Sequence, residues 1–182
     1  TATVAGHDVT EAPEDVRRSI GFLSANTGLY GRLTAAEMIR YFADLQEVAD
    51  PAGRTTELIE RFGIEEFAHV RCDRLSTGMK QKVSIARAIV HDPPVLVFDE
   101  PTLGLDVLVS ETLLQFIESC KTSGRCVLFS THIMREAERL CDRIGIIHQG
   151  RILAIGTLDE LRARTGEHYL EQVFIRLVEG EE

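Results

Sequence analysis

The second half of the chain alternates short apolar runs with helical patterns, and this alternation constrains the fold more than any other feature. Strand-like runs occur at 95–99, 126–131 and 143–150, and helical patterns at 108–124 and 134–141 separate them. Runs that are apolar throughout are typical of buried strands in a parallel sheet, whose crossover connections are helices. We therefore expect an α/β fold with a mostly parallel sheet that helices cover on both faces.

The first half predicts a short strand at 20–24 and then a helical segment. Thr34 and Glu37 have the spacing of a capping box, which predicts that a helix starts there. Gly63 closes the next helical pattern, because glycine readily adopts the left-handed conformation that ends many helices. Residues of about 34–70 thus form a helical segment between two parts that contain strands.

Three further local patterns complete the predicted elements. A helix after Ser76 should end by Pro93, because proline disfavours helical geometry in the residue before it. A hairpin is expected to turn at Gln149–Gly150. Thr157 and Glu160 form a second possible capping box at the start of another helix. The helix after Ser76 carries its apolar face at Met79, Val83, Ala86 and Val90.

Composition excludes some functions. The 182 residues are 44% hydrophobic and 27% charged, as in ordinary globular domains, and the net charge of -9 argues against bulk nucleic-acid binding. No apolar run approaches the length of about 20 residues that a membrane-spanning helix needs. The four cysteines lack metal-ligand spacing and are interpreted as reduced thiols.

Polar residues gather where two of the predicted strands end. Asp99 and Glu100 directly follow the run 95–98, and Thr131 and His132 end the next run. Ligands of parallel sheets bind beyond the carboxyl ends of the strands, so neighbouring strands would bring these groups to one crevice. Adjacent carboxylates resist joint ionisation unless a cation or distinct environments separate them. Mg²⁺ near Asp99, with Glu100 orienting an attacking water and His132 contacting a transferred phosphoryl group, would give each a distinct role.

Each of these features has an ordinary structural interpretation when it is taken alone. Asp99 and Glu100 could be a solvated strand end, and His132 a surface histidine. Ser76 is a good N-cap residue whether or not it binds a ligand. The order in which these features follow one another favours the functional interpretation.

That order resembles the ATP-binding subunit, or nucleotide-binding domain, of ABC transporters. Leu75–Met79 resembles the signature motif, Val95–Glu100 the Walker B strand with its glutamate, Leu103–Asp106 the D-loop and His132 the switch histidine. The "STGM" form of the signature, together with residues 26–37, most resembles the subfamily of bacterial sodium exporters and drug exporters with separate membrane subunits.

The resemblance implies a fold and an organisation. It implies a P-loop NTPase-like parallel sheet flanked by helices, with an inserted helical subdomain and a truncated N-terminus. Residues 1–182 would be one partial ABC ATPase domain, with the helical subdomain at about 30–75 and the Walker B and switch lobe at about 76–182. The subunit would hydrolyse ATP with Mg²⁺, power export through a separate membrane permease and lie in the cytoplasm on the inner face of the cell membrane.

The resemblance also implies roles for single residues and partners. A second ATPase subunit would form a head-to-tail dimer with this one, residues 29–46 would dock the membrane subunit, and no nucleic acid would be bound. The implied roles are Glu100 as general base or water-orienting group, Asp99 for Mg²⁺, His132 for the γ-phosphate, Ser76, Thr77 and Gly78 for the ATP of the opposite subunit, and Asp106 for dimer communication.

Two features depart from the family pattern. A Walker A loop requires G-x-x-x-x-G-K-[ST], and none of the 14 glycines is followed by lysine. The simplest interpretation is that Thr1 is a partial start with the phosphate loop upstream, so the 182-residue chain is expected to bind MgATP poorly and to be inactive alone. The family's Q-loop glutamine also has no counterpart, and Ala25 or, with a one-residue shift, Asn26 takes its place.

Two other functions remain as alternatives. An SMC-type or repair-type DNA ATPase lobe also carries a signature and Walker B without Walker A, but a long heptad coiled coil should precede it. The compact helices ahead of Ser76 and the acidic charge argue against that alternative. A catalytically dead fragment acting as a binding module is favoured if Thr1 is a genuine start.

Overall fold

The computed structural model describes residues 1–24 and 28–180. The chain divides into two compact units, residues 1–130 and 131–182, which are described separately below. None of the helices in the described part of the chain is long and apolar enough to cross a membrane.

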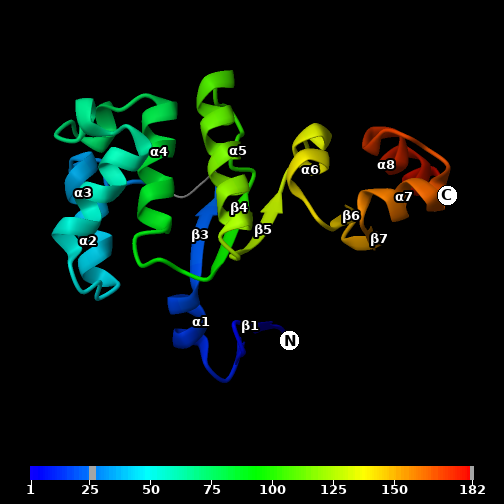
Figure 1. Ribbon diagram of the computed structural model, residues 1–182, viewed down its shortest axis with the longest axis horizontal. Helices are drawn as coiled ribbons and strands as arrows, with labels where there is room; N and C mark the ends of the chain where they lie inside the picture. The colour runs from blue at the N-terminus through cyan, green and yellow to red at the C-terminus, as the bar shows by residue number, and fades with distance from the viewer. Residues whose placement is uncertain (25–27, 181–182) are drawn as a thin grey trace. The chain divides into compact units, whose positions relative to one another are not determined.

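Unit 1 combines a small hairpin, a three-stranded sheet and a group of helices (Figure 1). The elements of unit 1 are, in order, β1 (Thr3–Val4), β2 (His7–Asp8), α1 (Pro13–Ser19), β3 (Ile20–Ser24), α2 (Ala35–Leu45), α3 (Pro51–Phe62), the 3₁₀ turns η1 (Glu65–Phe67) and η2 (Cys72–Arg74), α4 (Thr77–Ala88), β4 (Val95–Asp99), α5 (Val107–Thr122) and β5 (Cys126–Ser130).

The sheet of unit 1 is parallel, in the order β3-β4-β5. The strands predicted at 20–24 and 95–99 are confirmed with these bounds. At the carboxyl edge, Ser24, Asp99 and Ser130 lie side by side in register. β4 and β5 are therefore neighbours in the sheet of unit 1.

Helices pack on one face of this sheet. Phe98 is buried there and its ring lies 6.4 Å from that of Phe116 in α5. Gly21 faces the end of α4 so closely that a Cβ atom would lie 2.5 Å from the carbonyl oxygen of Ala88. On the opposite face, Phe22 and Leu128 are 52% and 65% exposed. Apolar side chains on the second face are thus partly exposed in the described part of unit 1.

Local sequence determines how the helical segment begins and ends. The predicted capping box is present, because the Thr34 side chain accepts from the backbone of Glu37 and the Glu37 carboxylate accepts from Thr34. Gly63 ends α3 in the left-handed conformation, with φ 59°. The helix after Ser76 is also confirmed, although it ends at Ala88, before Val90 and Pro93.

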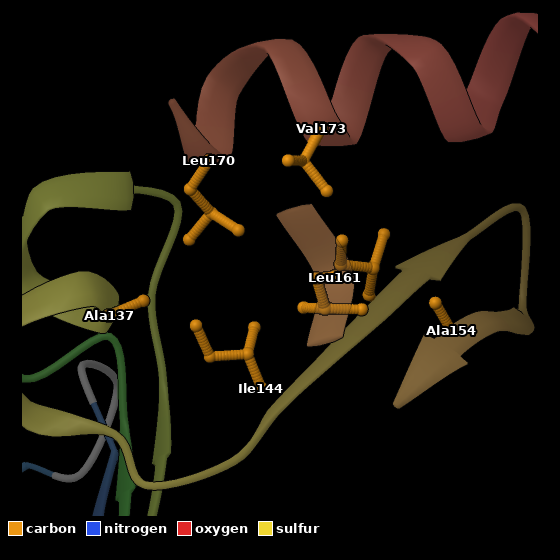
Figure 2. Close-up of a cluster of buried hydrophobic side chains, with 7 residues drawn as sticks. Ala137, Ile144, Ala154, Leu161, Leu170 and Val173 are labelled. Atoms are coloured by element: carbon orange, nitrogen blue, oxygen red, sulfur yellow. The ribbon is translucent and has the colours of Figure 1, made fainter. Parts of the chain in front are cut away.

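Unit 2 is a hairpin covered by helices. Its elements are α6 (Met134–Leu140), β6 (Ile144–His148), β7 (Arg151–Gly156), α7 (Leu158–Thr165) and α8 (Leu170–Glu179). The hairpin turns at Gln149–Gly150 as predicted, with both residues at positive φ, and the capping box of Thr157 and Glu160 is confirmed. Figure 2 shows the apolar cluster inside this unit, which includes Ala137, Ile144, Ala154, Leu161, Leu170 and Val173.

Candidate functional site

The acidic pair at the end of β4 is held by the last residue of β5. Ser130 Oγ donates a hydrogen bond of 2.7 Å to Asp99 Oδ1. The backbone N–H of Glu100 donates to the same Ser130 Oγ at 3.1 Å and to the Ser130 carbonyl at 3.2 Å. Sequence reasoning placed the two acids at this edge but missed Ser130, because it considered only Thr131 and His132 on the neighbouring strand.

The backbone at Glu100 has an unusual conformation. Its φ of 47° lies in the left-handed region, which non-glycine residues seldom occupy. Two contacts hold the turn that follows: Leu103 N donates to the Glu100 carbonyl at 3.1 Å, and Gln81 Nε2 of α4 donates to the Pro101 carbonyl at 2.6 Å. The direction in which Glu100 leaves the sheet is thus fixed by bonds on both sides of it.

The signature residues lie at the start of α4. Ser76 is the N-cap, and its hydroxyl accepts from Met79 N at 3.3 Å. Thr77 and Gly78 form the first turn, where backbone N–H groups lack helical partners and attract anions. The ordinary capping role of Ser76 is therefore real, and it is compatible with a nucleotide phosphate at the same helix end.

Gly78 brings this helix end close to the D-loop. A Cβ atom at position 78 would lie 3.0 Å from Val109 Cγ2 and 3.8 Å from Asp106 Oδ2. Asp106 is the N-cap of α5, where its Oδ1 accepts from Leu108 N and Val109 N at 3.0 Å each. Unit 1 therefore brings the signature and the D-loop aspartate together at the starts of two helices.

His132 belongs to unit 2. The Thr131 hydroxyl before it accepts from Ile133 N at 3.0 Å and donates to Glu136 Oε2 at 3.1 Å, which fixes the start of this segment. A cavity of about 430 Å³ lies beside the histidine. The cavity is lined by His132, Ile133, Met134, Arg135, Glu171, Phe174 and Ile175.

The acidic pair has the donor chemistry that Mg²⁺ requires when a substrate phosphate completes the shell. Among residues 1–24 and 28–180 there is no group of three or more His, Cys, Asp and Glu side chains that could hold a metal ion alone. Mg²⁺ usually takes only one or two protein carboxylates and completes its coordination with waters and phosphates. The Asp99 carboxylate, beside the Ser130 hydroxyl, fits such a partial site.

The Q-loop prediction cannot be compared with the fold, because Ala25 and Asn26 lie outside the described residues.

A buried cation holds the chain at Gly28. Arg87 of α4 donates to the Gly28 carbonyl at 3.4 Å, and its guanidinium lies 5.1 Å from the centre of the Phe42 ring. Burial lowers the pKa of Arg87 from its ordinary value.

Comparison with known proteins decides the family. Residues 1–103, more than half of the chain, match the family described as "ABC transporter". This chain belongs to that family. The ABC fold expected from the sequence, a parallel sheet flanked by helices, is confirmed by the solved "ATP binding subunit of ABC transporter", which is 34% identical with a TM-score of 0.87 and covers 97% of this chain and 75% of that one.

Proteins similar in sequence to this chain are described as ABC transporter ATP-binding proteins. NatA, an "ABC transporter ATP-binding protein" of Bacillus subtilis, is 40% identical, and the match covers 98% of this chain and 74% of NatA. YbhF, a "probable multidrug ABC transporter ATP-binding protein" of Escherichia coli, is 34% identical, and the match covers 97% of this chain but 32% of YbhF. The chain thus spans about three quarters of one relative and about a third of the other.

A second similar structure was solved with nucleotide bound. The ATP-binding cassette MJ0796, described as a dimer "bound to ADP and Pi", is 25% identical with a TM-score of 0.73. The match covers 85% of this ABC protein and 72% of MJ0796. The chain is therefore an ABC ATP-binding protein by sequence and by fold.

Proposed function

We propose that this ABC protein is the ATP-hydrolysing subunit of an exporter whose membrane permease is a separate chain. The observation that carries the proposal is the arrangement within unit 1, where the signature lies at the start of α4, the acidic pair at the end of β4 and Asp106 at the start of α5. Two relatives support export, because they are described as linearmycin and daunorubicin resistance ATP-binding proteins and are each 33% identical to this chain.

In this proposal the acidic pair divides the work of phosphoryl transfer. Asp99 would hold Mg²⁺, which when bound neutralises charge on the nucleotide phosphates. Glu100 acts as the general base or orients the attacking water, and the bond from its backbone N–H to Ser130 fixes the point from which the side chain extends. His132 contacts the γ-phosphate and stabilises the charge that develops on it.

The signature acts on the ATP of the opposite subunit in a head-to-tail dimer. The backbone N–H groups of Thr77 and Gly78 at the start of α4 suit an anion, and Ser76 adds a hydroxyl. Asp106, which lies beside Gly78, carries communication across the dimer. The dimeric state of MJ0796 supports this arrangement.

The membrane subunit docks on residues 29–46 of a helical subdomain at about 30–75. Tyr30, Tyr41 and Leu45 are exposed in this segment, and the rings of Tyr30 and Tyr41 lie 5.8 Å apart. Exposed aromatic side chains are frequent anchors of protein interfaces. The subunit would then lie on the cytoplasmic face of the cell membrane, with residues 76–182 as its Walker B and switch lobe.

Two measurements test the proposal. In vesicles that contain the natural-length protein and its permease, we expect ATP hydrolysis that requires Mg²⁺, and no hydrolysis would contradict the proposed function. The 182-residue chain alone lacks a glycine followed by lysine and should bind MgATP with a Kd above about 1 mM in calorimetry. A micromolar Kd for this chain would contradict the expected weak binding of MgATP.

A further inference from the structure

We propose that Ser130 is a positioning residue that fixes the Asp99 carboxylate and the Glu100 backbone at the same time. The inference rests on the proposed function, because it concerns the residues assigned to Mg²⁺ and to the attacking water. It adds a residue that neither the motif comparison nor the sequence reasoning singled out. Ser130 lies on a different strand from the acids, 31 positions from Asp99 in the sequence.

The Ser130 hydroxyl donates one hydrogen bond and accepts another. A serine hydroxyl has one hydrogen and two lone pairs, whereas an ionised carboxylate only accepts. The 2.7 Å bond to Asp99 Oδ1 therefore uses the hydrogen of Ser130, and the 3.1 Å bond from Glu100 N uses a lone pair. One hydroxyl thus joins both acids, and its bond to the carboxylate is of the stronger, charge-assisted kind.

Ser130 also holds the backbone of Glu100. Its N–H is shared between two acceptors of one residue, the Ser130 carbonyl at 3.2 Å and the Ser130 hydroxyl at 3.1 Å. Any residue at position 130 would offer the carbonyl, but the second acceptor is the serine hydroxyl, which alanine lacks. A left-handed backbone at a non-glycine residue persists where its surroundings hold it, and Ser130 supplies part of that hold.

The Ser130 hydroxyl can be removed without disturbing the core. Ser130 is exposed at the end of β5, so Ser130→Ala leaves no buried cavity. Ser130→Thr keeps the hydroxyl, and its branched side chain suits a strand. Ser19→Ala is the matched control, because Ser19 is a partly exposed serine of unit 1 whose hydroxyl donates to the nearby Asp15 carbonyl and not to the acidic pair.

Amide hydrogen exchange tests the inference without nucleotide. In the 182-residue chain, we expect Ser130→Ala to raise the exchange rate of the Glu100 amide about tenfold, the effect of losing one hydrogen bond of ordinary strength. The Leu96 amide in β4 should keep its rate, which shows that the sheet is intact. Ser130→Thr and Ser19→Ala should exchange like the wild type. An unchanged Glu100 rate in Ser130→Ala would overturn the inference.

Steady-state kinetics of the natural-length protein with its permease tests the consequence. We expect Ser130→Ala to lower kcat about tenfold with little change in KM for ATP, and Ser130→Thr to restore most of the loss. Wild-type kcat in Ser130→Ala would overturn the positioning role in hydrolysis. If the wild-type protein hydrolyses no ATP, the proposed function fails, and the Glu100 exchange rate alone then decides whether Ser130 holds the acidic pair.

Discussion

The start of α4 and the end of β4 carry the two halves of the proposed chemistry, and they are held in different ways. Ser76 caps α4 through a bond to Met79, three residues away. Asp99 and Glu100 depend on Ser130, about thirty positions away. The comparison indicates that the signature end is organised by local sequence, whereas the acidic end exists only when the sheet has formed.

The difference extends to the surroundings of each region. The helical segment before Ser76 is delimited by local caps at Thr34 and Gly63. The sheet that carries the acids depends on contacts between distant residues, such as the close approach of Gly21 to the end of α4. Substitutions in the two regions should therefore differ in what they damage.

The largest effect is expected from Glu100→Gln. The variant keeps the backbone bonds to Ser130 but removes the carboxylate that we propose orients water, so ATP hydrolysis by the natural-length protein should fall about 10²- to 10⁴-fold. Folding should be unaffected in urea denaturation. Glu14→Gln, an exposed acid in the first turn of α1, is the control and should hydrolyse ATP normally. Activity near wild type in Glu100→Gln would remove Glu100 from the mechanism.

Gly21→Ala should produce the largest loss of stability. Its Cβ atom would lie 2.5 Å from the Ala88 carbonyl and 2.8 Å from Leu96 Cδ2, so the sheet and α4 must separate. We expect the free energy of unfolding to fall by about 2 to 3 kcal/mol in urea denaturation. A Cβ atom at Gly28 would meet no atom of the described residues within 4 Å, so Gly28→Ala should change the free energy of unfolding by less than about 0.5 kcal/mol. Equal stability of the two variants would contradict the close packing of β3.

A smaller loss is expected from a local cap. Thr34→Ala removes one half of the capping box and should lower the free energy of unfolding by about 1 kcal/mol. Thr56→Ala is the control, because Thr56 lies within α3 and its hydroxyl donates to the Ala52 carbonyl in the preceding turn. A Thr34→Ala variant as stable as Thr56→Ala would mean that tertiary packing, and not the cap, fixes the start of α2.

The smallest effect concerns pH. Burial lowers the pKa of His91 below its ordinary value of 6.5. The bond to the Ile20 carbonyl and the nearby Asp92 oppose this shift, and Arg54 adds to it. Below pH 6.5 His91 binds a proton in the unfolded chain, whereas burial resists protonation in the folded chain. The free energy of unfolding therefore decreases as the pH is lowered from 6.5 to the lowered pKa. His91→Gln should flatten this slope in urea denaturation between pH 7 and 5. If the wild type and His91→Gln show the same slope, other groups cause the pH dependence of stability.

The sequence predicted what depends on neighbours in the chain. The capping boxes, the left-handed Gly63, the hairpin at Gln149–Gly150 and the strands around the acids follow from short patterns and are confirmed. Ser130 could not be found in this way, because its role depends on the register that places it opposite Asp99. The partial exposure of Phe22 and Leu128 was also not predicted, since an apolar strand pattern does not show how much of each side chain is covered.

The helix at Leu170–Glu179 was not predicted, although its apolar positions pack into the core of unit 2 (Figure 2). The roles of Asp99, Glu100 and His132 in hydrolysis, and of the signature in binding ATP, stay predictions. They rest on the order of the motifs and on the geometry of the described residues.

The most direct test of the account mixes two inactive variants of the natural-length protein. Glu100→Gln damages the acidic end, and Gly78→Asp damages the signature end by placing a carboxylate beside Asp106, where an anion should bind. If each ATP is served by the acids of one subunit and the signature of the other, the mixed dimer contains one intact site. We then expect hydrolysis to reappear when the two are combined with the permease. No recovery in verified mixed dimers would contradict the division of the site between subunits.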